Sequence, residues 1–128
     1  MTPITEVSSQ IVVHVKPYFI EQRRIETQVQ FVFGYHVTIE NNSDHTIQLL
    51  RRHWIITDSD GKQSEVAGEG VVGLQPTIEP SQKFEYSSGS SFKTPLGFMQ
   101  GKYTMRRGDD EFDVAIAPFR LADDTAIH

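Results

Sequence analysis

Residues 28–41 carry an apolar side chain at every second position over most of their length, and this period of two constrains the fold more than any other feature of the chain. The apolar members occupy every second position: Val29, Phe31, Phe33, Tyr35, Val37 and Ile39. Successive side chains of a β-strand point to opposite faces, whereas a helical pattern repeats about every 3.6 residues. The segment is therefore predicted to be a long strand with one face in a hydrophobic core.

Other segments show strand patterns that are bounded by turn residues. They are residues 11–16, 46–57, 83–87, 101–106 and 111–117. The first of them is expected to stop near Pro17, because proline lacks a backbone donor. Residues 21–26 are polar and predict a loop or a single helical turn, and no convincing amphipathic helix is found.

Two turn-rich stretches predict hairpins. Residues 41–45 would join the strand at 28–41 to the strand at 46–57, and residues 107–110 would join 101–106 to 111–117. Short strands separated by turns indicate an all-β sandwich or barrel. We favour an immunoglobulin-like or fibronectin-III-like antiparallel sandwich, in which Trp54 is a large core or inter-sheet residue.

Bulk properties narrow the function. The 128 residues predict a single domain, ordered over residues 8–121 with a frayed tail after Leu121. The net charge of −5 argues against a general nucleic-acid binder. The absence of cysteine removes disulfides, thiol catalysis and the common zinc motifs. No signal peptide or long apolar run is visible, so a cytoplasmic protein without a membrane role is expected.

Residues 68–73, GEGVVG, match the dinucleotide-binding pattern G-x-G-x-x-G. That motif requires a following helix, whose first N–H groups hold the pyrophosphate. Pro76 and Pro80 instead forbid a normal helix interior, and the next segment alternates like a strand. The glycines therefore predict a loop or bulge in a β protein and not a Rossmann site.

Five segments, in order along the chain, carry a resemblance to a known family. They are residues 47–58 (IQLLRRHWIITD), 68–76 (GEGVVGLQP), 84–89 (FEYSSG), 94–101 (TPLGFMQG) and 112–121 (FDVAIAPFRL). Together they resemble the bacterial ApaG family. The resemblance implies a fibronectin-III-like sandwich and no catalytic residues. It also implies kinship with partner-binding domains of F-box proteins and of a polymerase-interacting protein, and a historical link to cobalt and magnesium efflux.

A direct metal site is not expected. None of the histidines forms a closely spaced ligand pair: His14, His36, His45, His53 and His128. Cation efflux also needs a passage through the membrane, and this chain shows no segment for one. The link to cobalt and magnesium resistance is therefore predicted to be indirect, and no cofactor is expected.

Two groups of residues remain as candidate sites. Arg51 and His53 share one face of a strand, with Arg52 on the other face beside Trp54. They are either charges on a solvent-facing strand or a basic contact patch. The loop 68–73 either binds an anion through successive N–H groups or uses its glycines for backbone geometry.

The leading hypothesis is a non-enzymatic protein–protein interaction module of unknown pathway, which binds an unknown protein partner through end loops or a sheet edge. The expected surface combines the loops 68–76 and 94–101 with two basic residues of the strand at 46–57. Its members are Arg51, His53, Gly70, Gln75, Pro76, Thr94, Pro95 and Gly97. The alternative is phosphate, pyrophosphate or nucleotide binding at Gly68, Gly70 and Gly73. The sequence also leaves open a homodimer that forms through an exposed sheet edge.

Overall fold

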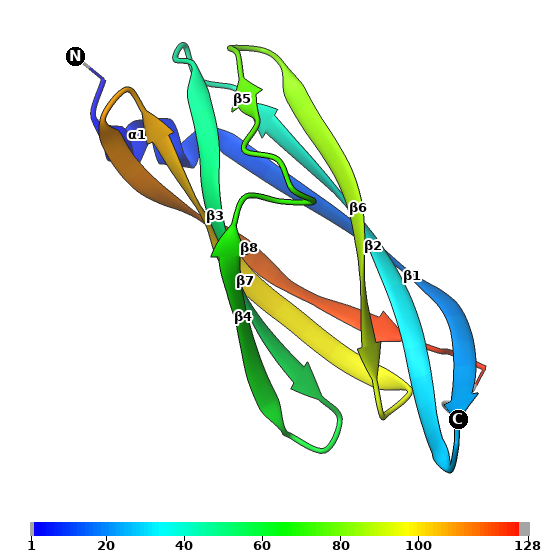
Figure 1. The fold of residues 1–128 in the computed structure, drawn as a ribbon. Helices are drawn as coiled ribbons and strands as arrows, with labels where there is room; N and C mark the ends of the chain where they lie inside the picture. The colour runs from blue at the N-terminus through cyan, green and yellow to red at the C-terminus, as the bar shows by residue number, and fades with distance from the viewer. Residues whose placement is uncertain (1, 126–128) are drawn as a thin grey trace.

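Two antiparallel sheets pack face to face in the computed structural model, which describes residues 2–125 (Figure 1). The three-stranded sheet has the order β1-β2-β6 and consists of β1 (Ile11–Ile25), β2 (Gln28–Asn41) and β6 (Lys83–Phe92). The five-stranded sheet has the order β4-β3-β7-β8, with β5 paired to β3. Its strands are β3 (Ile47–Asp58), β4 (Gln63–Glu69), β5 (Thr77–Ile78), β7 (Leu96–Arg107) and β8 (Asp110–Ala122). The predicted all-β, fibronectin-III-like sandwich is confirmed.

The apolar row of β2 lies in the core, as its alternation predicts. Phe33 is fully buried and makes edge-on aromatic contacts with Phe19 and Phe92, at ring-centroid distances of 5.5 and 5.8 Å. Trp54 comes from the opposite sheet and packs against Tyr35, with a centroid distance of 5.5 Å. Aromatic pairs of this kind add to the stabilisation that their burial provides. Trp54 is therefore the inter-sheet residue that was expected.

The predicted hairpin between β2 and β3 is wrong, because the two strands lie in different sheets. The buried Asn41 side chain organises the connection between them. Its amide donates to the carbonyl oxygens of His45 and Ile78 at 2.8 and 2.9 Å, and its oxygen accepts from Ser43. This loop carries the chain across the core, so that the two apolar rows face one another. The second predicted hairpin, β7 with β8, is confirmed.

Strand β1 runs beyond its predicted end at Pro17 and includes most of the expected loop at residues 21–26. Proline is tolerated here because β1 is an edge strand of its sheet. The far part of β1 pairs with the start of β2 and ends in a turn at Glu26, which has a φ of 57°. Residues 21–25 of this part are exposed to solvent, and all of them except Ile25 are polar.

The chain ends differ from expectation in two ways. A short helix, α1 (Ile4–Ser9), places the fully buried Val7 in the core, although no helix was predicted. After Leu121 the chain is still docked, since Asp123 is buried and its N–H donates to the carbonyl oxygen of Pro95 at 2.9 Å. The rest of the predicted frayed tail, residues 126–128 including His128, lies outside the described residues. Across residues 2–125, no helix has the length and apolar character that crossing a lipid bilayer requires.

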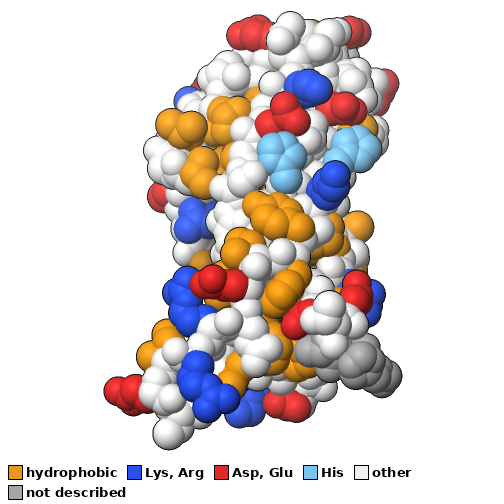
Figure 2. Space-filling model, turned by 90° about the vertical axis from the view of Figure 1, so that its right-hand side faces the viewer, with side chains coloured by type: hydrophobic (Ala, Val, Ile, Leu, Met, Phe, Trp, Pro, Cys, Tyr) orange, Lys and Arg blue, Asp and Glu red, His pale blue; other side chains and the backbone are white. Residues whose placement is uncertain are grey.

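The outer face of the three-stranded sheet is polar and carries His14 and His36, each of which lies close to a glutamate. His36 contacts Ser87 at 2.8 Å and Glu85 at 3.2 Å, and the hydrogen bond from His36 lowers the pKa of Glu85. Figure 2 shows this side of the molecule, with two histidines beside acidic side chains in its upper half. Tyr18 covers Gly34, where any Cβ atom would collide with the ring.

Candidate functional site

A bulge in β3 at Leu50 determines how the candidate basic residues are displayed. The pairing of β3 with β7 shifts register between Leu49 and Arg51. Leu49 is fully buried, so the extra residue turns Arg51 outward and Arg52 inward, on the same side as the buried Trp54. Bulges re-aim side chains in this way and often lie next to functional sites. The two neighbouring arginines therefore belong to different surfaces.

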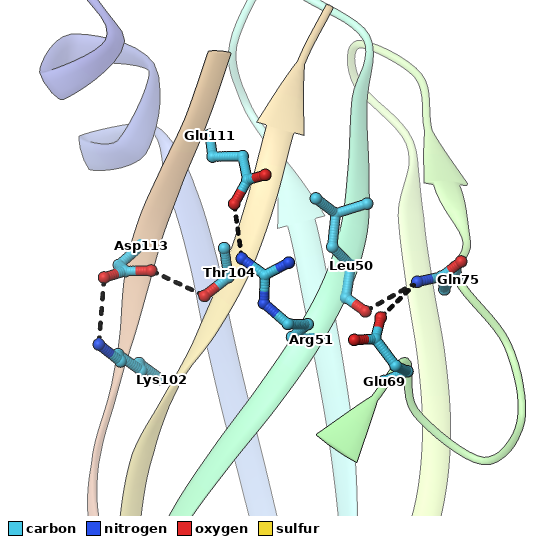
Figure 3. Close-up of polar contacts among 8 residues, drawn as sticks. All are labelled: Leu50, Arg51, Glu69, Gln75, Lys102, Thr104, Glu111 and Asp113. Carbon is cyan, nitrogen blue, oxygen red and sulfur yellow. Dashed lines mark hydrogen bonds and ion pairs between the residues drawn. The ribbon is translucent and has the colours of Figure 1, made fainter. Parts of the chain in front are cut away.

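The outward arginine belongs to a ladder of ion pairs on the outer face of the five-stranded sheet (Figure 3). Arg51 contacts Glu111 at 2.5 Å, and this hydrogen bond raises the pKa of Arg51. Asp113 accepts from Lys102 at 3.2 Å and from Thr104 at 2.8 Å. Partial burial pushes the pKa of Asp113 upward, but these hydrogen bonds outweigh it, and the pKa lies below its usual range.

His53 and Gln75 extend this outer surface. His53 lies 3.6 Å from Glu65, while the Gln75 amide donates to the Leu50 carbonyl oxygen at 3.0 Å and to Glu69 at 3.2 Å (Figure 3). These side chains are exposed or half-buried, and they interact with neighbouring acidic side chains and with the β3 backbone. Exposed pairs of this kind contribute little to stability. The arrangement presents charged groups whose positions are fixed by one another.

The glycine loop uses its backbone N–H groups within the protein. The Gly70 N–H donates to the Leu50 carbonyl oxygen at 2.7 Å, and Val71 and Leu74 exchange two hydrogen bonds of 2.8 and 2.9 Å. Gly68 lies in β4, paired with Arg52. The N–H groups of Gly70 and Val71 are thus occupied, which favours backbone geometry over an anion-binding nest as the reason for these glycines.

Residues 71–74 form a tight two-residue turn with one unusual member. Val72 and Gly73 have φ values of 44° and 79°, as a type I′ turn requires. Glycine adopts this conformation readily, but a β-branched residue there is a genuine outlier. The Val72 side chain is 54% exposed, so core packing does not explain it. Strain of this kind is concentrated at functional sites.

Replacing Val72 by Asn is expected to raise the free energy of unfolding by about 1 kcal/mol, because Asn-Gly is a preferred pair for this turn. Urea unfolding of the Val72→Asn variant measures the change. Val66→Asn is the matched control, since it removes an exposed valine from an ordinary strand conformation. A loss of stability at Val72 equal to that at Val66 would show that the turn is not strained.

The inward arginine lies beside a hollow between the two sheets. Nη1 of Arg52 donates to the carbonyl oxygens of Glu69 and Gly70 at 3.0 and 2.9 Å. The hollow has a volume of about 290 Å³. Its lining consists of Tyr35, Arg52, Trp54, Glu69, Val71, Val72, Gly73, Tyr86 and Ser88. Burial raises the pKa of Tyr86 to about 12, and its hydroxyl bonds to that of Tyr103. Tyr86 therefore stays protonated at neutral pH.

The two loops that were expected to form one surface lie apart. Glu69 pairs with Arg51 near the middle of β3, whereas Gly97 pairs with Asp58 at its end. These positions are seven residues apart along β3, or roughly 23 Å. Thr94 and Pro95 lie at that distant end, where Thr94 contacts Ser59. Arg51, Gly70, Gln75 and Pro76 do come together, because hydrogen bonds to and from Leu49 and Leu50 tie the loop to β3. His53 lies two residues beyond Arg51 and contacts Glu65 instead.

Comparison with known proteins identifies the family. The ApaG domain model matches residues 21–107. The chain belongs to the ApaG family. Protein ApaG of Shewanella denitrificans is 48% identical over 113 residues, which cover 88% of this chain and 90% of that protein. Protein ApaG of Mesorhizobium japonicum is 46% identical over 116 residues, covering 90% and 89%.

Solved structures agree with this membership. The crystal structure of a structural-genomics target superimposes with a TM-score of 0.91 at 42% identity, covering 95% of this chain and 93% of that one. The putative ApaA protein of Bordetella pertussis gives 0.81 at 42% identity, covering 88% and 92%. The names of these ApaG relatives state no activity. Within residues 2–125, no three metal-ligating side chains are grouped as a metal site would require.

Proposed function

We propose that this ApaG-family chain is a non-enzymatic protein-binding module and that it binds through the side where β4 and the loop 70–76 meet. One observation carries the proposal: the apolar side chains of Val72 and Leu74 in the loop are 54% and 53% exposed, and Val66 of the preceding strand β4 is 42% exposed. Val72 is held in an unfavourable conformation while it is exposed. A surface that displays apolar groups with a polar rim is typical of interfaces.

The rim of this surface is supplied by the ion-pair ladder. Arg51, Glu69 and Gln75 border the loop. Gln75 bonds to Glu69 and to the β3 backbone, and Arg51 is held by Glu111 (Figure 3). Rim charges of this type steer association and set specificity more than they add affinity. Charged side chains that are held in fixed positions fit a binding module, because binding requires no reactive group.

Site-specific photo-crosslinking in bacterial cells tests the proposal. A photoreactive phenylalanine analogue at Leu74 is expected to give one discrete adduct with another protein, and the same analogue at Val72 the same adduct. The matched control is Phe98, which is 41% exposed on β7 near the far end of β3. Adducts that are absent at Leu74 and Val72, or equal at Phe98, would overturn the assignment of this surface.

A further inference from the structure

We propose that an extended segment of a partner protein adds a strand to the free edge of β6 and places a carboxylate on Arg52. This inference rests on the proposed protein-binding function and specifies how the partner binds. Strand addition is a common mode of peptide recognition, in which backbone hydrogen bonds give affinity and alternate side chains give specificity.

The two sheets differ in width on this side of the sandwich. The three-stranded sheet ends at β6, whereas the five-stranded sheet continues past β3 to β4. Figure 1 shows β4 at the edge of its sheet and well away from β6. Val66 of β4 pairs with Trp54 and so points to the same face, yet Val66 is 42% exposed while Trp54 is 3% exposed. The inner face of β4 therefore lacks a covering strand.

The inward-facing side chains of β6 change from aromatic to small and polar beside the part of β4 that no strand covers. Phe84 and Tyr86 pack against the core, but the next inward positions are Ser88 and Ser90, before Phe92 returns to the core. Both serines are half-buried. Two small polar side chains at inward positions leave space beside Trp54, and Ser88 lines the hollow that results. The two serines in the sequence of β6 thus account for the space beside Trp54.

Residues 87–92 of β6 also lack the features that protect strand edges, although Lys83 lies at the start of the strand. Natural edges use lysine, proline or a bulge to prevent pairing with another chain. Strand β1, at the other edge of the sheet, has Pro17 and a register shift near Ile20. Residues 87–92, SSGSSF, contain neither lysine nor proline, and their pairing with β2 is continuous. This segment can accept another strand.

Arg52 supplies the chemical preference. A guanidinium group has five N–H donors in a planar fork that suits a carboxylate. Among the described residues, Arg52 donates hydrogen bonds from Nη1 alone, to the two backbone oxygens of the loop. None of the ion pairs formed within residues 2–125 includes Arg52. Since Trp54 and Val66 lie beside it, the fitting ligand is a peptide with apolar residues at alternate positions and one acidic side chain.

A library of random linear dodecapeptides, displayed on phage and selected against the full chain, provides the probe. Selected peptides are expected to alternate apolar residues and to carry an acidic residue. They are also expected to slow amide hydrogen exchange in residues 88–92 and to shift the fluorescence of Trp54, the one tryptophan of the chain. Failure to select peptides, or binding that protects other amides instead, would overturn the proposal.

Synthetic forms of a selected peptide, with the acidic side chain or its amide counterpart, test the carboxylate contact. Wild type is expected to bind the acidic form about tenfold or more tightly, as a charge-assisted hydrogen-bonded pair provides. Arg52→Gln should abolish this preference, whereas Arg120→Gln, at an exposed position on β8, should retain it. Val66→Asp, at a position that is 42% exposed, should weaken binding of both peptides. A preference that survives in Arg52→Gln would contradict the assignment.

Inorganic phosphate distinguishes a small-anion site. If phosphate alone shifts Trp54 fluorescence and displaces the peptide, without protecting residues 88–92, the hollow binds small anions and strand addition is wrong. If the crosslinks at Leu74 and Val72 form but no peptide protects the β6 edge, the binding function stands and only this mode fails. If neither is seen, both fail.

Discussion

Replacing Phe33 by Ala is expected to lower the free energy of unfolding by about 3–5 kcal/mol, the range for truncating a phenylalanine in a packed core. Phe33 is fully buried at the centre of β2, and its ring contacts Phe19 and Phe92. Removing the ring leaves a cavity that rigid neighbouring strands cannot close. Urea unfolding followed by the fluorescence of Trp54 measures the loss.

The matched control is His36→Ala, three residues further along the same strand and on the outer face. His36 hydrogen-bonds to Ser87 and Glu85 but is half-exposed, so its loss should change stability by less than about 1 kcal/mol. Comparable large losses for both variants would mean that both faces of β2 are buried. A small loss at Phe33 would contradict the packing of the two sheets.

Strand faces were predictable from the sequence, whereas strand partners were not. The alternation in β2 correctly assigned Phe33 to the core, because a period of two reports which face avoids water. It does not report which edge forms hydrogen bonds. Strands β2 and β3 each carry a long apolar row, and pairing them in a hairpin was compatible with both patterns. The buried hydrogen bonds of Asn41 favour the crossing to the opposite sheet, and they depend on Ile78, which is distant in sequence.

The candidate surface was predictable only in part for a similar reason. The opposite orientations of Arg51 and Arg52 followed from simple alternation. The bulge at Leu50, which places the buried Leu49 on the same inward face as Arg52 and Trp54, depends on pairing with β7. Grouping Thr94 and Gly97 with the glycine loop failed because spacing along the chain says nothing about position along β3. The signal that was missed is the pair Ser88 and Ser90, which interrupts an inward row with small polar residues.

Replacing Gly70 by Ala is expected to lower the free energy of unfolding by about 2–5 kcal/mol, from two effects that add. Gly70 has a φ of 64°, a conformation that costs an L-residue roughly 1–2 kcal/mol. A Cβ atom there would also collide with the backbone carbonyl oxygen of Leu74. Overpacking of this kind typically costs about 1–3 kcal/mol. Leu74 cannot move away without losing its two hydrogen bonds to Val71.

Gly73→Ala separates the two effects. Gly73 has a φ of 79°, but nothing lies within 4 Å of a Cβ atom at that position. Its replacement should therefore cost only the conformational part, about 1–2 kcal/mol. Gly70→Ala should in addition shift the fluorescence of Trp54, because the Gly70 carbonyl oxygen holds Arg52 at the hollow, and Gly73→Ala should not. Equal losses and equal spectra for the two variants would show that the close approach of Leu74 to Gly70 does not support the loop.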